Sequence, residues 1–283
     1  PEQVNRELDL AYSYAIGQLG EPGPSYIEIP TDILRSTVIN KSILSDWMIQ
    51  KRPYEIHPSP LNIKILIEKL NASKRPLLIS GRGAKSSGKV LENFLSKTGI
   101  LYLDTQDSRG LISESHKCNI FAARSKVMAE ADLVIILGRK LDYQLAYGSP
   151  AIFKEATFIR ISDNPHELVD NRRGTPEIYA DPKIVLQKIN NMALATKFDQ
   201  GWISEVKNFH LQKIKKAKIK KQIKIGDDSK IHPSYIFTCI SKLYSDNFVG
   251  IADGGDILSF ARVGLKSKYY LDSGVFGCLG IGI

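Results

Sequence analysis

Hydrophobic positions follow two different spacings between residues 61 and 190. Continuous apolar runs are typical of strands buried on both faces, and they occupy residues 76–80, 100–103, 133–137 and 157–161. Between these runs, apolar residues recur every three or four positions, the spacing of a helix with one buried side. The helical stretches are 61–70, 90–97, 122–130, 165–171 and 182–189. Strands that alternate with helices in this way predict a doubly wound parallel sheet, an α/β fold.

The same spacings predict further elements on both sides of this region. Residues 2–19 have a helical spacing and residues 26–29 alternate as a short strand, whereas the prolines before residue 61 argue against regular structure. Beyond residue 190 we expect helices at 202–224, 235–244 and 257–263, and strands at 248–252 and 269–271. We therefore divide the chain into 1–38, a linker at 39–60, a central domain at 61–192, a connecting helix at 193–230, and 231–283.

The formal charge of +9 is concentrated in one segment. Eight lysines and no acidic residue lie between residues 207 and 224, and the rest of the chain is close to neutral. A basic run can bind nucleic acid, but this one contains no arginine, and Phe209 is its only aromatic residue. We therefore expect a solvated helix and no nucleic-acid partner.

The cysteines and the apolar runs bear on the cellular setting. The three cysteines lie far apart and form no C-x-x-C pair, so neither a disulfide framework nor a zinc site is indicated. No apolar run approaches the roughly 20 residues that a membrane helix needs. We expect reduced thiols, a cytoplasmic location and no membrane partner. Because the chain begins with Pro1 and stops inside a glycine-rich run, we also expect it to be part of a longer protein.

Two glycine-rich turns follow predicted strands near the end of the chain. In the first, Gly254 and Gly255 lie between Asp253 and Asp256 and precede a helix, and the second lies within residues 273–283. A glycine turn between a strand and a helix can bring backbone N–H groups to a phosphate, and loops at the ends of neighbouring strands face one crevice. Plain turn chemistry explains such a pair equally well.

Two further turns, each with an arginine, follow strands of the predicted central sheet. The first contains Gly81, Arg82 and Gly83, and the second contains Gly138 and Arg139. Each is a candidate phosphate loop for a nucleotide, in which the arginine supplies charge. The G-x-G-x-x-G pattern of dinucleotide sites is absent. A helix-capping turn with a surface arginine is the alternative.

Three stretches, taken together and in this order, resemble the thiamine-diphosphate-dependent enzymes. They are GPSYIEIPTD at 23–32, ADLVIILGRKLD at 131–142, and residues 249–283 with both late glycine turns. The resemblance is to the branch that contains acetolactate synthase-like proteins, 2-hydroxyacyl-CoA lyases and oxalyl-CoA decarboxylases. It implies the end of a pyrimidine-binding domain, a complete Rossmann-like central domain and the beginning of a pyrophosphate-binding domain.

The resemblance implies thiamine diphosphate as the cofactor. The first late glycine turn would contact the diphosphate, and the second would contact the aminopyrimidine. The Gly277 carbonyl would accept a hydrogen bond from the 4′-amino group, and Leu279 would support the bent conformation of the cofactor. The implied binding residues are Asp253, Gly254, Gly255, Asp256, Gly277, Cys278 and Leu279. The activating glutamate and the GDG…N segment that holds Mg²⁺ are expected outside residues 1–283. No catalytic or metal-binding residue is therefore assigned within them.

In the central domain the resemblance implies bound FAD or ADP. The implied phosphate-binding residues are Gly81, Arg82, Gly83, Gly138 and Arg139. The family commonly has Asp-Ile-Asp near the ribose, where this chain has Ser162, Asp163 and Asn164. Asp163 is the expected substitute, shifted by one position, and a shift of one residue at a strand end turns a side chain to the other face.

The function implied by the resemblance is the making or breaking of a C–C bond next to a carbonyl. The implied substrates are 2-keto acids or acyl-CoA, and the implied assembly is a homodimer or homotetramer. Taken alone, the 283 residues are expected to be inactive. A non-catalytic module that binds ADP, FAD or NAD is the first alternative, and an assembly subunit held by the lysine-rich helix is the second.

Overall fold

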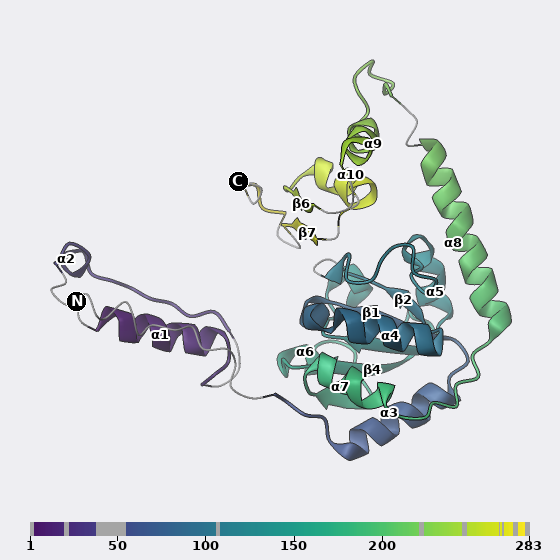
Figure 1. Ribbon diagram of the computed structural model, residues 1–283, viewed down its shortest axis with the longest axis horizontal. Coiled ribbons are helices and arrows are strands. Elements are labelled where there is room, and N and C mark those ends of the chain that lie inside the picture. Colours follow the sequence, from purple (N-terminus) through teal and green to yellow (C-terminus); the bar gives the residue numbers. More distant parts are fainter. Residues whose placement is uncertain are drawn as a thin grey trace. The chain divides into compact units, whose positions relative to one another are not determined.

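Figure 1 shows the computed structural model of the chain. It describes residues 3–19, 23–37, 55–105, 108–220, 224–244, 248–265, 267, 269–273 and 277–280. The chain divides into two compact units, Pro1–Ile56 and His57–Ile283. Most of the predicted linker, residues 39–54, and the end of the last glycine-rich run, residues 281–283, lie outside the described residues.

The first unit contains a helix and an extended segment. Helix α1 (Val4–Ala15) confirms the predicted N-terminal helix, and a short helix, α2 (Thr31–Leu34), begins after Pro30. The strand predicted at residues 26–29 is wrong, because residues 23–30 pair with no strand in the described part of the chain. An alternating pattern becomes a strand only where a neighbour supplies the ladder of hydrogen bonds.

Five parallel strands form the central sheet, in the order β2-β1-β3-β4-β5. They are β1 (Pro76–Ser80), β2 (Leu101–Leu103), β3 (Leu133–Leu137), β4 (Thr157–Ser162) and β5 (Glu177–Tyr179). The predicted parallel sheet is confirmed, and every residue of β1, β2 and β3 is buried. The sequence does not predict β5, because three residues are too few to show a spacing and only its middle residue is buried.

Helices cover both faces of this sheet, as the sequence predicts. They are α3 (Pro60–Ala72), α4 (Gly88–Thr98), α5 (Arg124–Glu130), α6 (His166–Val169) and α7 (Pro182–Asn190). Figure 1 shows α4 and α7 side by side in front of the sheet, and the two helices are in contact. The connections from β1 to β2 and from β2 to β3 run in opposite directions across the sheet. Right-handed crossovers therefore place α4 and α5 on opposite faces.

Helix α8 (Gln200–Lys220) is the predicted lysine-rich connection. Its first turns pack on the central domain through Trp202 and Val206, which are buried, and the Trp202 Nε1 donates to Glu130 Oε2 at 3.0 Å. Residues 211–217 are mostly exposed, as expected for a solvated basic helix. Among the described residues, no helix is both long and apolar enough to cross a membrane.

The last segment of the chain contains two parallel strands and two helices. They are α9 (Pro233–Leu243), β6 (Val249–Ala252), α10 (Asp256–Gly264) and β7 (Tyr269–Asp272). His232 caps α9, because its Nδ1 accepts from the backbone N–H of Ser234 at 3.2 Å. One face of the strand pair packs on both helices, and this small core comprises Phe237, Ala252, Leu258, Ala261 and Tyr270. All four elements confirm the sequence prediction.

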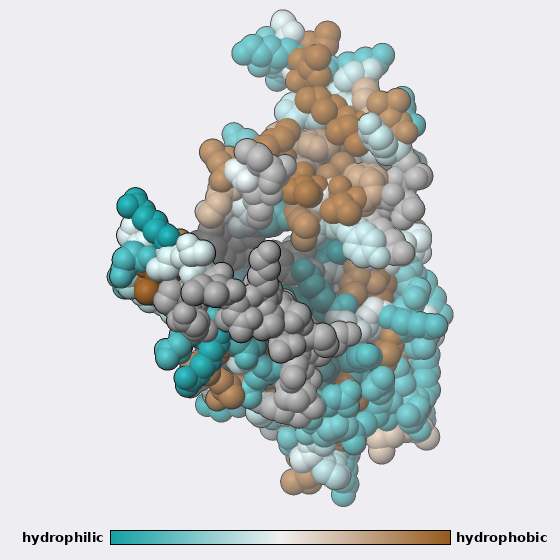
Figure 2. Space-filling view, turned by 60° about the vertical axis from the view of Figure 1, so that its left-hand side comes forward, coloured by the Kyte–Doolittle hydropathy of each residue, from teal (hydrophilic) through white to brown (hydrophobic). Residues whose placement is uncertain are grey.

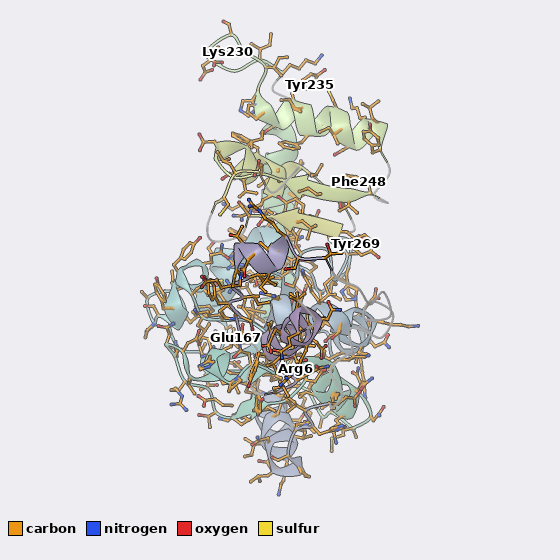
Figure 3. The ribbon with its side chains drawn as sticks, turned by 90° about the vertical axis from the view of Figure 1, so that its left-hand side faces the viewer. Arg6, Glu167, Lys230, Tyr235, Phe248 and Tyr269 are labelled. Atoms are coloured by element: carbon orange, nitrogen blue, oxygen red, sulfur yellow. The ribbon has the colours of Figure 1, made fainter. Side chains whose placement is uncertain are left out.

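The opposite face of this strand pair is exposed. Val249 pairs with Tyr269, and Ile251 pairs with Leu271, so that these four side chains lie together on one face. Each of them is exposed, and Figure 2 shows hydrophobic residues gathered over this segment in the upper part of the view. Figure 3 labels Phe248, which directly precedes β6, and Tyr269, the first residue of β7.

The buried middle of β3 provides the first prediction. Ile135 is 2% exposed, and its replacement by Ala should lower the free energy of unfolding by roughly 2–5 kcal/mol, because the lost side chain leaves a cavity. The matched control is Leu61→Ala on α3, where the side chain is 64% exposed and the loss should stay within about 0.5 kcal/mol. Urea unfolding measures both. Equal losses would contradict the assignment of β3 to the core.

A second prediction concerns His210, which fastens α8 to the central domain. Its Nδ1 accepts from the backbone N–H of Ala122 at 3.2 Å, and its ring packs edge-on against Phe121. Burial lowers the pKa of His210. The unfolded chain therefore takes up a proton at a higher pH than the folded chain, and stability falls as the pH drops below about 6.5.

Thermal unfolding measured between pH 7.5 and pH 5 tests this expectation. His210→Gln does not titrate, and it should show a smaller loss of stability over the same interval than the parent chain. A residual loss is expected from His116, whose pKa is also lowered by burial. An unchanged pH dependence in the variant would show that His210 does not contribute.

Candidate functional site

The two late glycine turns lie against each other at the ends of β6 and β7. A Cβ added to Gly254 would lie 2.2 Å from the Gly277 carbonyl oxygen, so only glycine allows the two loops to approach this closely. Gly255 has a φ of 82° and Gly277 a φ of 58°, both in the left-handed region, and an added Cβ at either would meet no atom within 4 Å. The structure thus brings the two turns together, and the crevice that they were expected to face stays a prediction.

The carboxylate of Asp253 joins these two loops. Its Oδ1 accepts from the N–H of Gly254 at 3.0 Å, and its Oδ2 accepts from the N–H of Gly280 at 2.8 Å. Asp256 begins α10, where a negative charge is favourable beside the N–H groups of the first turn. Cys278 and Leu279 are exposed on the second loop, and all three cysteines of the chain are free.

These loops fit one part of a thiamine diphosphate site. The glycines leave open space beside the N-terminus of α10, which suits a phosphate. Asp253 and Asp256, however, bring like charge to that place, and a diphosphate beside them needs a cation. No group of three or more His, Cys, Asp or Glu side chains within the described residues has the arrangement to hold a metal. The described residues of these loops, taken alone, therefore do not form a metal site.

The other predicted loops meet in the central domain, where β1 and β3 are neighbours. From β1 the chain continues to β2 on one side of β1, and from β2 it crosses back to β3 on the other side of β1. The position between β1 and β3 is therefore the topological switch point of the sheet, where such folds bind ligands. The N–H of Gly81 donates to the Leu137 carbonyl, and the N–H of Gly83 donates to the Gly138 carbonyl, both at 2.9 Å. The structure therefore brings the two arginine-bearing turns together.

Arg139 is buried in this place and is paired. Its Nη1 and Nη2 donate to the two carboxylate oxygens of Asp142 at 2.9 and 2.8 Å, and Nη2 also donates to the Gln144 side chain at 3.2 Å. A second guanidinium, Arg124, donates to the backbone carbonyl of Gln144 at 3.2 Å. Burial and the neighbouring Arg139 lower the pKa of Arg124. Arg82, in contrast, is exposed on the first turn.

The end of β4 carries a carboxylate that the sequence does not predict. Ser162 Oγ donates to Glu167 Oε2 at 2.9 Å, so that Glu167 reaches back from α6 to the strand end (Figure 3). Burial raises the pKa of Glu167, the nearby carboxylates of Asp163 and Asp170 raise it further, and Arg139 opposes them. Glu167 follows Pro165 by two positions, and this helix-start pattern is the signal that could have located it.

Gly254 provides the prediction for the late loops. In Gly254→Ala the new methyl group would collide with the Gly277 and Cys278 carbonyls, so the loops should separate and the amide of Gly280 should exchange with solvent faster. The matched control is Gly23→Ala, where an added Cβ meets nothing within 4 Å. Hydrogen exchange measured on peptides that cover residues 277–280 provides the comparison. Equal exchange in both variants would contradict the close approach of the loops.

The sequence of this chain is similar to those of known proteins, both in its central domain and over nearly its whole length. Residues 63–189 match the family profile described as the thiamine pyrophosphate enzyme central domain. A 2-hydroxyacyl-CoA lyase of Arabidopsis thaliana is 28% identical and aligns with 100% of this chain and 51% of its own length. An oxalyl-CoA decarboxylase of Escherichia coli (strain K12) is 25% identical, with 99% and 52% covered, and the human 2-hydroxyacyl-CoA lyase 2 is 23% identical, with 96% and 49% covered.

The chain spans about half the length of these relatives. The alignment with the Arabidopsis lyase covers the whole chain, so it includes the two late glycine turns as well as the central domain. The parallel sheet of residues 76–179 is the structure that the central-domain match requires. By its central domain and its relatives, this chain is similar to the thiamine-diphosphate-dependent enzymes.

Proposed function

We propose that this chain is a portion of a thiamine-diphosphate-dependent enzyme that cleaves or forms a C–C bond next to a carbonyl. The observation that carries the proposal is the alignment of nearly the whole chain with a 2-hydroxyacyl-CoA lyase and an oxalyl-CoA decarboxylase. Both of these relatives act on an acyl-CoA. We therefore favour an acyl-CoA substrate over the 2-keto acids of an acetolactate synthase, which remain the second candidate class.

Several residues of this chain would contribute to the cofactor site. When bound, thiamine diphosphate supplies a thiazolium carbanion and an electron sink for the reacting carbonyl. The N-terminus of α10 would face the diphosphate through Gly254 and Gly255, and Asp253 would keep the two loops together. The Gly277 carbonyl would accept from the aminopyrimidine, with Cys278 beside it and Leu279 against the cofactor. Asp256 would lie next to the cation that the diphosphate requires.

Other parts of the proposal concern the whole protein. Mg²⁺ is the cation that suits a diphosphate with carboxylate and carbonyl oxygens around it, and its further ligands would come from segments of the relatives that this chain does not span. A homodimer or homotetramer and a cytoplasmic location remain predictions. The resemblance also implies FAD or ADP in the central domain, with Gly81, Arg82, Gly83, Gly138, Arg139 and Asp163 as contacts, and only a binding measurement can decide whether this chain accepts them.

The 283 residues alone should bind thiamine diphosphate weakly and should not turn over substrate. This expectation follows because the chain spans about half of its relatives and its two loops form one wall of the site. The test titrates thiamine diphosphate with Mg²⁺ by calorimetry and assays a 2-hydroxyacyl-CoA, oxalyl-CoA and pyruvate. Micromolar binding or turnover would show that the chain holds more of the site than its loops indicate.

A longer form of the protein that includes the segments present in the relatives should gain both properties. Cleavage of a 2-hydroxyacyl-CoA or decarboxylation of oxalyl-CoA would identify the acyl-CoA class, and acetolactate formation from pyruvate would identify the 2-keto acid class. A longer form that melts at a higher temperature with ADP, FAD or NAD, but not with thiamine diphosphate, would favour the non-catalytic module instead.

A further inference from the structure

The crevice at the switch point of the central sheet has few free backbone donors. A phosphate in such a crevice is normally held by N–H groups of the turn that follows the first strand. In this chain the N–H groups of Gly81 and Gly83 donate to the Leu137 and Gly138 carbonyls, and the N–H of Ala84 donates to the Gly81 carbonyl. The first two donors thus extend the contact between β1 and β3, and the third closes the turn on itself, so that none of the three faces a ligand.

The side chain of Arg139 lies across the same turn. A Cβ added to Gly81 would come within 2.5 Å of Cδ and 2.7 Å of Cβ of Arg139, which shows that the arginine stem covers the backbone there. Arg139 is 7% exposed. A nucleotide phosphate that approached Gly81 would therefore have to displace this side chain.

Displacement of Arg139 would be unfavourable because its charge is already matched. Asp142 binds it through both carboxylate oxygens, and the same Asp142 accepts from the backbone N–H of Gln144 at 3.0 Å. Removing one member of a buried ion pair leaves the other uncompensated. The pair and its backbone contact thus hold the arginine in place without a ligand.

At the end of the neighbouring strand β4, polar groups also bind one another. Ser162 donates to Glu167, and Asn164 N–H donates back to Ser162 Oγ at 3.1 Å. This hydrogen-bond chain ties the end of β4 to α6 without a ligand.

We infer that Arg139 closes the switch-point crevice of this chain and keeps ADP, FAD and NAD out of it. Arg139 is in this sense the residue that decides whether the central domain accepts a nucleotide. The inference concerns the central domain alone and does not depend on the proposed C–C chemistry. The fold of the central domain suits a nucleotide, but the side chain of Arg139 fills the position that a nucleotide would take.

The experiment compares the full 283-residue chain with two crevice variants and one control variant by calorimetry and thermal melting, with ADP, FAD and NAD as probes. Arg139→Ala opens the crevice but leaves Asp142 without its partner. Arg139→Ala combined with Asp142→Asn removes the pair without leaving a charge behind, and the Asn oxygen still accepts from Gln144. Arg173→Ala, an exposed arginine paired with Glu177 on the same domain, is the matched control.

The original chain and the Arg173→Ala variant should show no binding up to about 1 mM ligand, whereas the double variant should bind at least one probe roughly tenfold more tightly or better. Micromolar binding of ADP, FAD or NAD by the original chain would overturn the inference. A folded double variant that gains no affinity for any probe would also overturn it, because some other feature would then exclude the nucleotide.

Discussion

The contact between two backbones at the ends of β1 and β3 is the constraint on which the central domain depends. A Cβ added to Gly138 would lie 2.6 Å from the Gly83 Cα, and one added to Gly83 would lie 2.9 Å from the Gly138 Cα. No side chain fits there, so three glycines at 81, 83 and 138 are needed to keep the central strands adjacent. Because every other strand is ordered outward from this pair, a change here would shift the whole sheet.

A buried arginine organises the other edge of the sheet. Arg160 on β4 is 1% exposed; it donates to the carbonyls of Asp170 and Arg172 and pairs with the Asp170 carboxylate. A buried charge needs acceptors close by, and those of the two Nη atoms come largely from the segment between α6 and β5. The arginine therefore fixes the fold of residues 167–172, and this segment in turn positions Glu167 beside the strand end.

The sequence predicts helices and strands correctly where the hydrophobic pattern is long. It does not predict them where contacts with distant residues determine the structure. The continuous apolar runs at 76–80 and 133–137 reveal their strands without further information, whereas the short alternating stretch at 26–29 pairs with nothing that the structure describes. At the candidate sites, chain order predicts that the glycine turns meet. It does not predict that Asp142, three positions after Arg139, neutralises it, because either side chain could equally have faced solvent or a ligand.

Different interactions hold the two late loops together and the two central loops together. A two-stranded sheet is marginal by itself, and the outer face of β6 and β7 leaves Val249, Ile251, Tyr269 and Leu271 exposed. The pairing of β6 with β7 and the small core on their other face bring the two turns near each other. Asp253, which binds an N–H on each loop, and Gly254, which allows their contact, then hold the turns together. Local polar contacts thus complete this site, whereas backbone contact between strand ends shapes the central one.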